Sequence, residues 1–362
     1  MIIRAVTLFY PVEGSRINTD EFRQELVKLR NVISDISRRR RTEIRTWRVT
    51  LPFIEPLWNF EELSTTINKA SADLGYIHAS LNIAMNTKFE LERVVNAFIK
   101  SGSYLSIWVG DFKELNDYNT ELFTNVLRRL VELNQWALSR RIAALIGDVI
   151  LTPYYPDSIN LNNSHGIALS ILYPSELSDE RNLHNDLTGV FKTAEDIGRE
   201  IAGELGVDYL GIDASLSPWG EESVIDAVER IYGIKFGGPG TLSAIYKLNK
   251  AIWEVSGRFR VTGFNEVMLP LAEDERLKAR AREGLITFSK LVKYTMTCVA
   301  GVDMVPIPSN QLPLIKGLIN DLHAIVSIKR RSIGLRLIPY PGNEAEVDLG
   351  DFGKAPVLDM MR

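Results

Sequence analysis

The feature that most constrains the fold of this chain is a regular alternation of two hydrophobic patterns. Runs of strand length, rich in β-branched and aromatic residues, alternate with longer runs in which apolar residues recur every three or four positions. This alternation is typical of βα units packed around a mostly parallel sheet. It predicts strands over 3–9, 43–50, 76–84, 104–109, 142–149, 165–173, 209–215, 261–269, 296–302 and 333–338.

One long stretch follows neither pattern. Residues 151–164 are rich in Pro, Asp, Asn and Ser, which predicts either a linker between two halves or a loop over a site. Because both patterns resume at once on either side, we expect a single α/β domain over 1–362. Its two half-barrels would span about 1–150 and 165–362, joined by the irregular loop.

Composition favours a globular protein that acts on small molecules. Apolar residues make up 45% and charged residues 24% of the chain, and the formal net charge is −4. Such a balanced charge argues against nucleic acid or an anionic membrane as a partner. The strongest basic run, Arg38 to Arg41, ends a predicted helix and is expected to be solvated. We expect a small-molecule anion and copies of this chain as partners, with a symmetric dimer as the simplest homo-oligomer.

Two further features bear on the cellular setting. The chain has a single cysteine, no apolar run of membrane-spanning length and no N-terminal signal peptide, which together predict a cytoplasmic protein. It also has only three glutamines and ion-rich helices, a weak indication of an archaeal or thermophilic source.

Several segments together resemble a known family. In the second half these are Gly211 to Pro218, Gly237 to Thr241, Thr295 to Pro308, Gly334 to Pro339 and Asp351 to Val357. In this order they resemble the uncharacterised family called domain of unknown function 711, and Arg4 to Thr7 and Ala143 to Pro156 also fit its pattern. That family is grouped by fold with pyruvate formate-lyase-like proteins. The resemblance therefore implies a ten-stranded α/β barrel made of two five-stranded halves, in agreement with the strand pattern.

Four aspartates follow predicted strands, each within two residues of a glycine: Asp111, Asp148, Asp213 and Asp303. In a barrel of βα units the loops after the strands form the rim where ligands bind. Carboxylates that meet there could exchange protons or hold a hard cation. The alternative is that each one caps a turn or the following helix. Asp213 and Asp303 are the candidates for catalysis because they lie in the family-like segments.

Cys298 is the third candidate catalytic residue. It lies in an apolar, strand-like run that is followed by Gly301 and Asp303, so its thiol could act at the rim as a nucleophile or radical relay. A free cysteine among apolar neighbours is also commonly a buried core residue. Arg260 to Phe264 resembles the signature around the radical glycine of glycyl radical enzymes. In those enzymes the glycine follows the cysteine near the C-terminus, whereas Gly263 precedes Cys298, so this chemistry is a remote alternative.

Other residues are candidates for holding an anion. A glycine-rich turn that precedes an amphipathic helix exposes amides to phosphate or carboxylate, although it could equally be a plain tight turn. An arginine inside an apolar strand needs either a carboxylate partner or a bound anion. The histidines have no zinc-binding spacing, so we predict no metal site, and the sequence identifies no cofactor. The candidate ligand-binding residues are Tyr155, His165, Ser215, Gly237, Gly238, Gly240, Thr241 and Arg336.

These features together predict a cytosolic metabolic protein with one pocket at a barrel mouth. The leading hypothesis is an enzyme that acts on a small carboxylate or phosphate metabolite, with Asp213 or Asp303 exchanging protons and Cys298 as an optional nucleophile. The alternative is a non-catalytic oligomer that senses a metabolite through the same pocket. The sequence leaves the substrate and the reaction class open.

Overall fold

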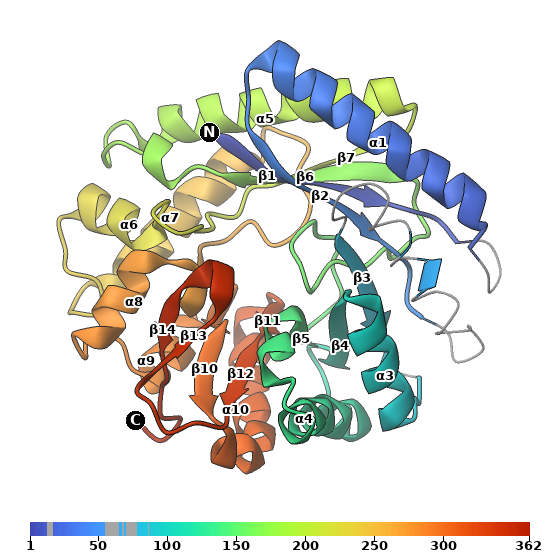
Figure 1. Cartoon of the computed structure of the whole chain (residues 1–362). Coiled ribbons are helices and arrows are strands. Elements are labelled where there is room, and N and C mark those ends of the chain that lie inside the picture. The colour runs from blue at the N-terminus through green and yellow to red at the C-terminus, as the bar shows by residue number, and fades with distance from the viewer. Residues whose placement is uncertain (13–16, 55–64, 67–68, 70–77, 86) are drawn as a thin grey trace.

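The computed structural model describes residues 1–362 except 13–16, 55–64, 67–68, 70–77 and 86, and it places strands inside a surround of helices (Figure 1). The described strands are β1 (Ile2–Phe9), β2 (Ile44–Thr50), β3 (His78–Ile83), β4 (Tyr104–Gly110), β5 (Ile142–Ile146), β6 (Gly166–Leu172), β7 (Asp208–Asp213), β8 (Met268–Pro270), β9 (Ala300–Asp303), β10 (Val305–Pro308), β11 (Ile333–Leu335), β12 (Leu337–Tyr340), β13 (Glu346–Asp348) and β14 (Lys354–Pro356). The described helices are α1 (Thr19–Arg40), α3 (Leu91–Ser101), α4 (Asp117–Glu132), α5 (Leu183–Leu205), α6 (Val224–Tyr232), α7 (Thr241–Ser256), α8 (Glu275–Arg282), α9 (Phe288–Tyr294) and α10 (Ile315–Lys329).

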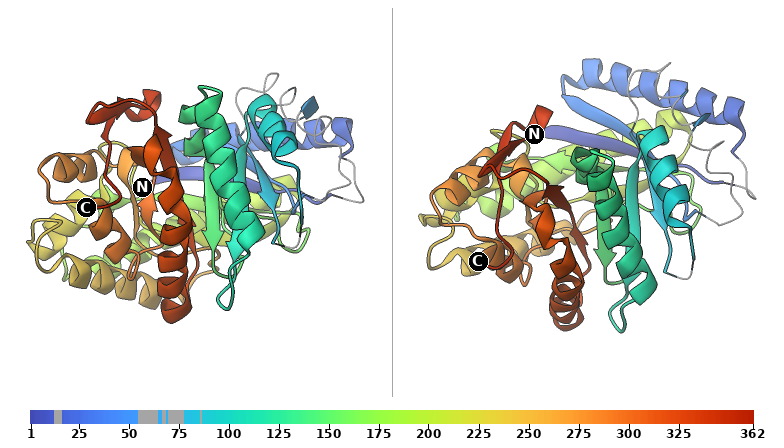
Figure 2. Two further views of the ribbon diagram at one scale, coloured as in Figure 1. Left: turned by 90° about the horizontal axis from the view of Figure 1, so that it is seen from below. Right: turned by 60° about the horizontal axis from the view of Figure 1, so that its bottom comes forward.

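The predicted α/β class is confirmed. Eight strands form one mixed, strongly curled sheet in the order β11-β5-β4-β3-β2-β1-β6-β7, which makes half of a barrel (Figure 2). Strands β1 to β5 are parallel to one another, and β6 is parallel to β7. The sheet is mixed because β1 pairs with β6, and β5 with β11, in antiparallel fashion.

This reversal decides which strand ends lie together. In the antiparallel pairs, Ile2 at the start of β1 faces Leu172 at the end of β6, and Ile333 at the start of β11 faces Ile146 at the end of β5. One end of the sheet therefore brings together the amino ends of β1 to β5 and the carboxyl ends of β6, β7 and β11. The carboxyl ends of β1 to β5 lie at the opposite end.

Backbone hydrogen bonds continue beyond the eight-stranded sheet. The segment that leads into β8 bonds to β7 and to the residues after it, β8 pairs in parallel with β9, and β9 bonds to the residue after β11. The bonded pairs, with the N–H donor first, are Thr262 to Ile212, Met268 to Leu216, Val299 to Val267 and Arg336 to Val302.

Several predicted strands are shorter than expected. The predicted strand over 261–269 is reduced to β8, which covers only Met268–Pro270. The predicted strand over 296–302 begins only at Ala300, because the turn after α9 continues to Cys298, whose N–H donates to the carbonyl of Tyr294 (3.0 Å). The predicted strand over 333–338 is divided into β11 and β12 at Arg336. The predicted strand over 76–84 is β3 in the structure, with residues 76–77 outside the described part.

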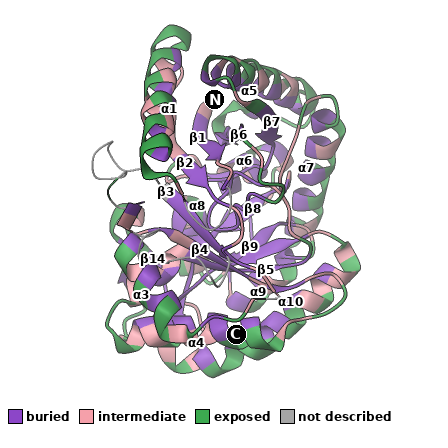
Figure 3. Ribbon diagram, turned by 90° about the vertical axis from the view of Figure 1, so that its right-hand side faces the viewer, coloured by how far each residue is buried: buried purple, intermediate pink, exposed green. Residues whose placement is uncertain are grey.

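The helices cover the outside of the sheet. The strands are mostly buried, and the outward faces of the helices are exposed (Figure 3). Helices α1 and α5 lie side by side, and the basic end of α1 is neutralised there. Arg39 and Arg40 form ion pairs with Glu200, and Arg39 also pairs with Glu204. Among the described helices, none has the length and apolar character needed to cross a membrane.

The irregular loop over 151–164 enters the space enclosed by the curled sheet. Residues 152–160 are all buried, although the segment is rich in polar and proline residues. Its polar groups bond to strand residues that face inward: Ser158 bonds to Thr50 of β2 (2.6 Å between hydroxyl oxygens) and accepts from Ser80 of β3 through its carbonyl (2.9 Å). The segment is therefore a buried part of the structure that is bonded to the sheet.

Asp213 at the end of β7 fixes one end of this loop. Its fully buried carboxylate accepts hydrogen bonds from the hydroxyl of Thr152 (2.8 Å), from the amide and hydroxyl of Ser215 (3.1 and 2.6 Å), and from the amides of Phe264 (2.9 Å) and Asn265 (3.0 Å). Burial raises the pKa of Asp213, and these hydrogen bonds oppose the rise. The carboxylate therefore ties three separate segments together.

We predict that Asp213→Ala lowers the free energy of unfolding by about 3 kcal/mol or more, because its buried donors lose their acceptor. The matched control is Asp208→Ala, which removes an exposed carboxylate from the same strand and should change stability by less than about 0.5 kcal/mol. Chemical denaturation of both variants provides the measurement. Equal losses would show that the Asp213 hydrogen bonds do not hold the loop.

Candidate functional site

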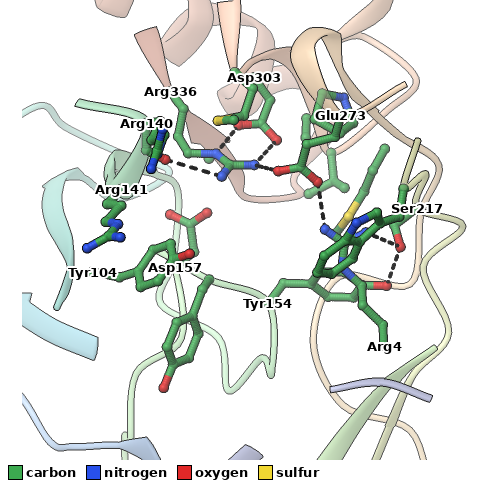
Figure 4. A pocket seen from close by; sticks show the side chains of 18 of the residues that line it. Arg4, Tyr104, Arg140, Arg141, Tyr154, Asp157, Ser217, Glu273, Asp303 and Arg336 are labelled. Atoms are coloured by element: carbon green, nitrogen blue, oxygen red, sulfur yellow. Dashed lines mark hydrogen bonds and ion pairs between the residues drawn. The ribbon is translucent and has the colours of Figure 1, made fainter. Parts of the chain in front are cut away.

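A cavity of about 290 Å³ lies where the amino ends of β1 to β5 meet the carboxyl ends of the second-half strands (Figure 4). Residues from β1, β2, β4, β8, β9 and β11 line it, together with the buried loop and a turn near Phe352. Its volume is close to the lower bound of typical ligand pockets, which suits a metabolite and is small for a dinucleotide.

A chain of buried ion pairs forms one part of the cavity wall. Arg4 of β1 donates to Glu273 (2.6 Å), Glu273 also accepts from Arg336 (3.0 Å), and Arg336 donates to both carboxylate oxygens of Asp303, one of them at 2.8 Å. Burial opposes ionisation, yet Arg4 and Arg336 hold the pKa of Glu273 below its usual value. Two cations thus balance two anions, and this part of the wall has no net charge.

Arg48 of β2 contributes a buried positive charge to the cavity. It is 7% exposed and donates to the hydroxyl of Thr46 (3.2 Å) and the carbonyl of Pro153 (3.3 Å), and its guanidinium lies over the Tyr155 ring, 4.9 Å from the centroid. Within the described part of the chain, no carboxylate forms an ion pair with it. Burial and then the nearby charge of Arg4 lower the pKa of Arg48, which reflects the cost of an unneutralised cation here.

Two more arginines reach the cavity just before β5. Arg140 donates to the carbonyl of Leu349 (3.2 Å), and Arg141 donates to the carbonyl of Gly102 (2.8 Å). The guanidinium of Arg141 lies 5.8 Å from the centroid of the Tyr104 ring. These side chains add positive charge on the same side of the cavity as Arg48, since β2 to β5 are consecutive in the sheet.

Asp157 of the buried loop points its carboxyl group toward the side of the cavity where Arg141 and Arg336 lie (Figure 4). It is 8% exposed, and its Oδ1 atom has no hydrogen-bond partner among the described residues. Burial and the charge of Asp303 raise the pKa of Asp157 to about 7, against the lowering effect of Arg336. The carboxyl group lies against Gly334, where a Cβ would come within 2.2 Å of its oxygen, so a larger residue at position 334 would displace it.

The structure brings three of the predicted site residues to this cavity: Tyr155, Asp303 and Arg336. The expectation that Arg336 needs a carboxylate partner is confirmed by its contacts with Asp303 and Glu273. Asp303 is accordingly held in a bidentate ion pair.

Asp213, Ser215 and Cys298 do not line the cavity. Ser215 bonds to Asp213 and to the amide of Glu266 (3.1 Å), so both side chains serve the turn after β7. The Cys298 side chain is fully buried in the main core, and burial raises its pKa to about 12, which disfavours the reactive thiolate. The catalytic roles of Asp213 and Cys298 stay predictions for which this geometry gives no support.

The glycine-rich turn lies elsewhere. The N–H of Gly237 donates to the Thr241 hydroxyl (3.0 Å), which itself donates to the carbonyl of Gly238 (2.8 Å), and Lys290 donates to the carbonyl of Gly237 (2.8 Å). The first two bonds are internal to a tight turn that also contains Gly240, the residue before α7, and the third joins this turn to α9. None of Gly237, Gly238, Gly240 and Thr241 lines the cavity.

The other rim candidates lie at the opposite end of the sheet. His165 precedes β6 and faces Glu25 (3.1 Å), and Gly166 next to it pairs with Phe9 at the end of β1. Asp111 caps its own turn by accepting from the amides of Lys113 and Glu114 (2.7 and 2.9 Å), as the capping alternative predicts. The expectation that the aspartates meet at one rim is wrong, because the two halves run in opposite directions.

Sequence reasoning missed Arg4, Arg48, Tyr104, Arg140, Arg141, Asp157 and Glu273, all of which line the cavity. The available signal was the presence of arginine within or just before otherwise apolar strands of the first half, the same signal that identified Arg336. Among the described residues, no group of three or more His, Cys, Asp or Glu side chains is arranged to hold a metal ion.

Comparison with known sequences finds a family that matches the second half of the chain. Residues 175–351 match the family model described as "Uncharacterised ACR (DUF711)". This match includes Glu273, Asp303 and Arg336, whereas Arg48 and Asp157 lie before it.

Several relatives share this region. The chain is 32% identical over 207 residues to a UPF0210 protein of Methanopyrus kandleri, an alignment that covers 54% of this chain and 46% of the relative. A UPF0210 protein of Pyrobaculum islandicum is 30% identical over 207 residues with the same coverage of 54% and 46%. One of Desulfovibrio desulfuricans is 33% identical over 207 residues, covering 54% and 43%. The chain spans just under half the length of these curated relatives, and through residues 175–351 it belongs to the uncharacterised DUF711 (UPF0210) family.

Proposed function

We propose that this chain binds a small carboxylate or phosphate metabolite in the cavity and acts on it as an enzyme by proton transfer. The observation that carries the proposal is the buried guanidinium of Arg48, which faces a cavity and has no carboxylate partner among the described residues. A buried charge of this kind is costly unless an anion neutralises it. Arginine also matches carboxylate and phosphate in geometry.

The charge balance of the lining supports an anionic ligand. Arg4 and Arg336 are neutralised by Glu273 and Asp303. Two further acids among the described residues line the cavity, Asp157, which is neutral below about pH 7, and the exposed Asp351, and neither forms an ion pair with Arg48. The buried charge of Arg48 is thus left for an anionic ligand to neutralise.

Asp157 is the group we assign to proton transfer. A carboxyl group with a pKa of about 7 is populated in both protonation states near neutral pH, which suits a general acid or base. Its partnerless Oδ1 atom would take a proton from, or return it to, a ligand oriented by Arg48. Asp303 is less suited to this role because Arg336 occupies both of its oxygens.

We also propose that the curled sheet is part of a ten-stranded barrel of the pyruvate formate-lyase-like type. The backbone bonds from β7 through β8 and β9 to the end of β11 support it, because they link the two edges of the eight-stranded sheet. The single-domain organisation over 1–362 is part of this proposal. Glycyl radical chemistry remains a remote alternative. Gly263 has a structural reason to be glycine, since a Cβ there would lie 2.0 Å from Asp213 Oδ2.

If the barrel closes, the linking amides should be protected from hydrogen exchange. We expect the amides of Thr262, Met268, Val299 and Arg336 to exchange as slowly as those of β1 and β6, because each donates to a backbone carbonyl of the neighbouring segment. Exchange measured by NMR or by mass spectrometry of peptides provides the test. Protection at the level of surface loops would mean that the sheet stays open.

Arg48→Gln should weaken the binding of pyruvate and inorganic phosphate by about 10-fold to 100-fold, since one charge-assisted hydrogen bond is lost. Isothermal titration calorimetry provides the affinity. The unfolding free energy without ligand should stay within about 1 kcal/mol of the parent or rise, because no carboxylate loses its partner. Arg39→Gln on α1 is the control and should leave both affinities unchanged. A large loss of stability with unchanged affinity would make Arg48 a structural residue.

Pyruvate affinity should fall as the pH rises from 6 to 8. Asp157 is neutral below its pKa of about 7 and negative above it, so the deprotonated carboxylate repels the anion. The slope cannot exceed about tenfold per pH unit, the limit for one linked proton. In Asp157→Asn the slope should vanish, and any exchange of ligand C–H for deuterium in D₂O, followed by NMR, should stop. Binding that never leads to exchange or turnover would favour a metabolite sensor.

A further inference from the structure

The two long walls of the cavity differ in chemistry. One wall is built by β2, β4 and the residues before β5, and it carries Arg48, Tyr104 and Arg141. The other is built by β8, β9 and the segment that leads into β8. In the sheet order, β1, β6 and β7 lie between β2 and the segment that leads into β8. At the other edge, β11 lies between β9 and β5. The two walls are therefore on opposite sides of the cavity.

Apart from Asp303 at the end of β9, which is paired with Arg336, the second wall is apolar and separate from the main core. Tyr154, Phe264, Met268, Val299 and Ala300 form a hydrophobic cluster of their own. All five of these residues line the cavity. Each is at most 6% exposed, so the cluster is shielded from bulk water and open mainly to the cavity space. Small apolar clusters of this kind, apart from the main core, are available to contact a ligand.

From this arrangement we infer that the ligand is an amphipathic acid, with a carboxylate or phosphate head at Arg48 and a short apolar body against Phe264, Met268 and Val299. This inference rests on the proposed function and specifies its substrate class. A body rich in hydroxyl groups is disfavoured, because hydroxyl groups placed against this apolar cluster would lose water without gaining a partner there.

The tyrosines and Asp157 fix how such a ligand is oriented. The ring of Tyr155 stacks beneath the Arg48 guanidinium, and Tyr154 belongs to the apolar cluster while its hydroxyl bonds to Ser217 (3.0 Å). Both come from the same buried loop as Asp157. The carboxyl group of Asp157 lies against Gly334 and is influenced by Arg336 and Asp303, so it would meet the part of the ligand that reaches this side of the cavity.

The test compares acids that share one head and differ in their apolar body. Acetate, butanoate and hexanoate are titrated into the full chain by calorimetry, with inorganic phosphate and glycerol 3-phosphate as a second pair. We expect affinity to rise by about threefold to fourfold per added methylene, the value for burying one such group. Glycerol 3-phosphate should bind no more tightly than phosphate.

Variants of the apolar wall make the test specific. Met268→Gln and Val299→Thr preserve side-chain size and should reduce the gain from acetate to hexanoate by about tenfold, with phosphate affinity unchanged. Met361→Gln, at an exposed methionine (74%), is the matched control and should have no effect. Equal affinity for acetate and hexanoate, with measurable binding of both, would overturn the inference and leave the proposed function standing. No binding of any of the five anions would refute both.

Discussion

The buried chain of Arg4, Glu273, Arg336 and Asp303 is the interaction on which the rest of the site depends. It joins the first strand to the end of β9 and to the residues after β8 and β11, which are far from that strand in the sequence. Removing one partner from such a buried network typically costs about 3 to 5 kcal/mol, because the remaining charge is left in a medium of low dielectric constant. Because the charges within this network balance one another, the network does not neutralise the buried Arg48, and this underlies the case for an anionic ligand.

The loop over 151–164 supplies the second constraint. Its polar groups could not remain buried without partners, and the inward-facing side chains of β2, β3 and β7 provide them. This internal bonding holds Tyr154, Tyr155 and Asp157 inside the curled sheet. A loop of this composition on the surface would have been solvated, and Asp157 would then have an ordinary acidity. The position of one loop thus determines both the shape of the cavity floor and the pKa of the group that we assign to proton transfer.

Some of the site could be predicted from particular residues. Arg336 was recognisable because a guanidinium in an apolar strand requires an anion, and the structure supplies Asp303 and Glu273. Asp111 was recognisable as a possible cap. The sequence could not show that Asp213 and Cys298 lie outside the cavity. A buried carboxylate that joins several segments and a thiol packed in the core occur in the same kinds of sequence segment as catalytic groups. Arg4, Arg48 and Tyr104 were missed because the rim rule for parallel barrels directs attention to residues after strands, and these lie within strands or at their start.

The sequence by itself determined the α/β class, the approximate strand positions and the presence of a buried arginine that requires a counter-ion. These follow from local periodicity and from the cost of burying charge, both of which are properties of short segments. Only the tertiary structure decided which strand ends lie together. That choice depends on the antiparallel pairing of β1 with β6 and of β5 with β11, a long-range contact with no local signature in either strand. The same pairing places the amino ends of one half beside the carboxyl ends of the other, and this is why the cavity lies where it does.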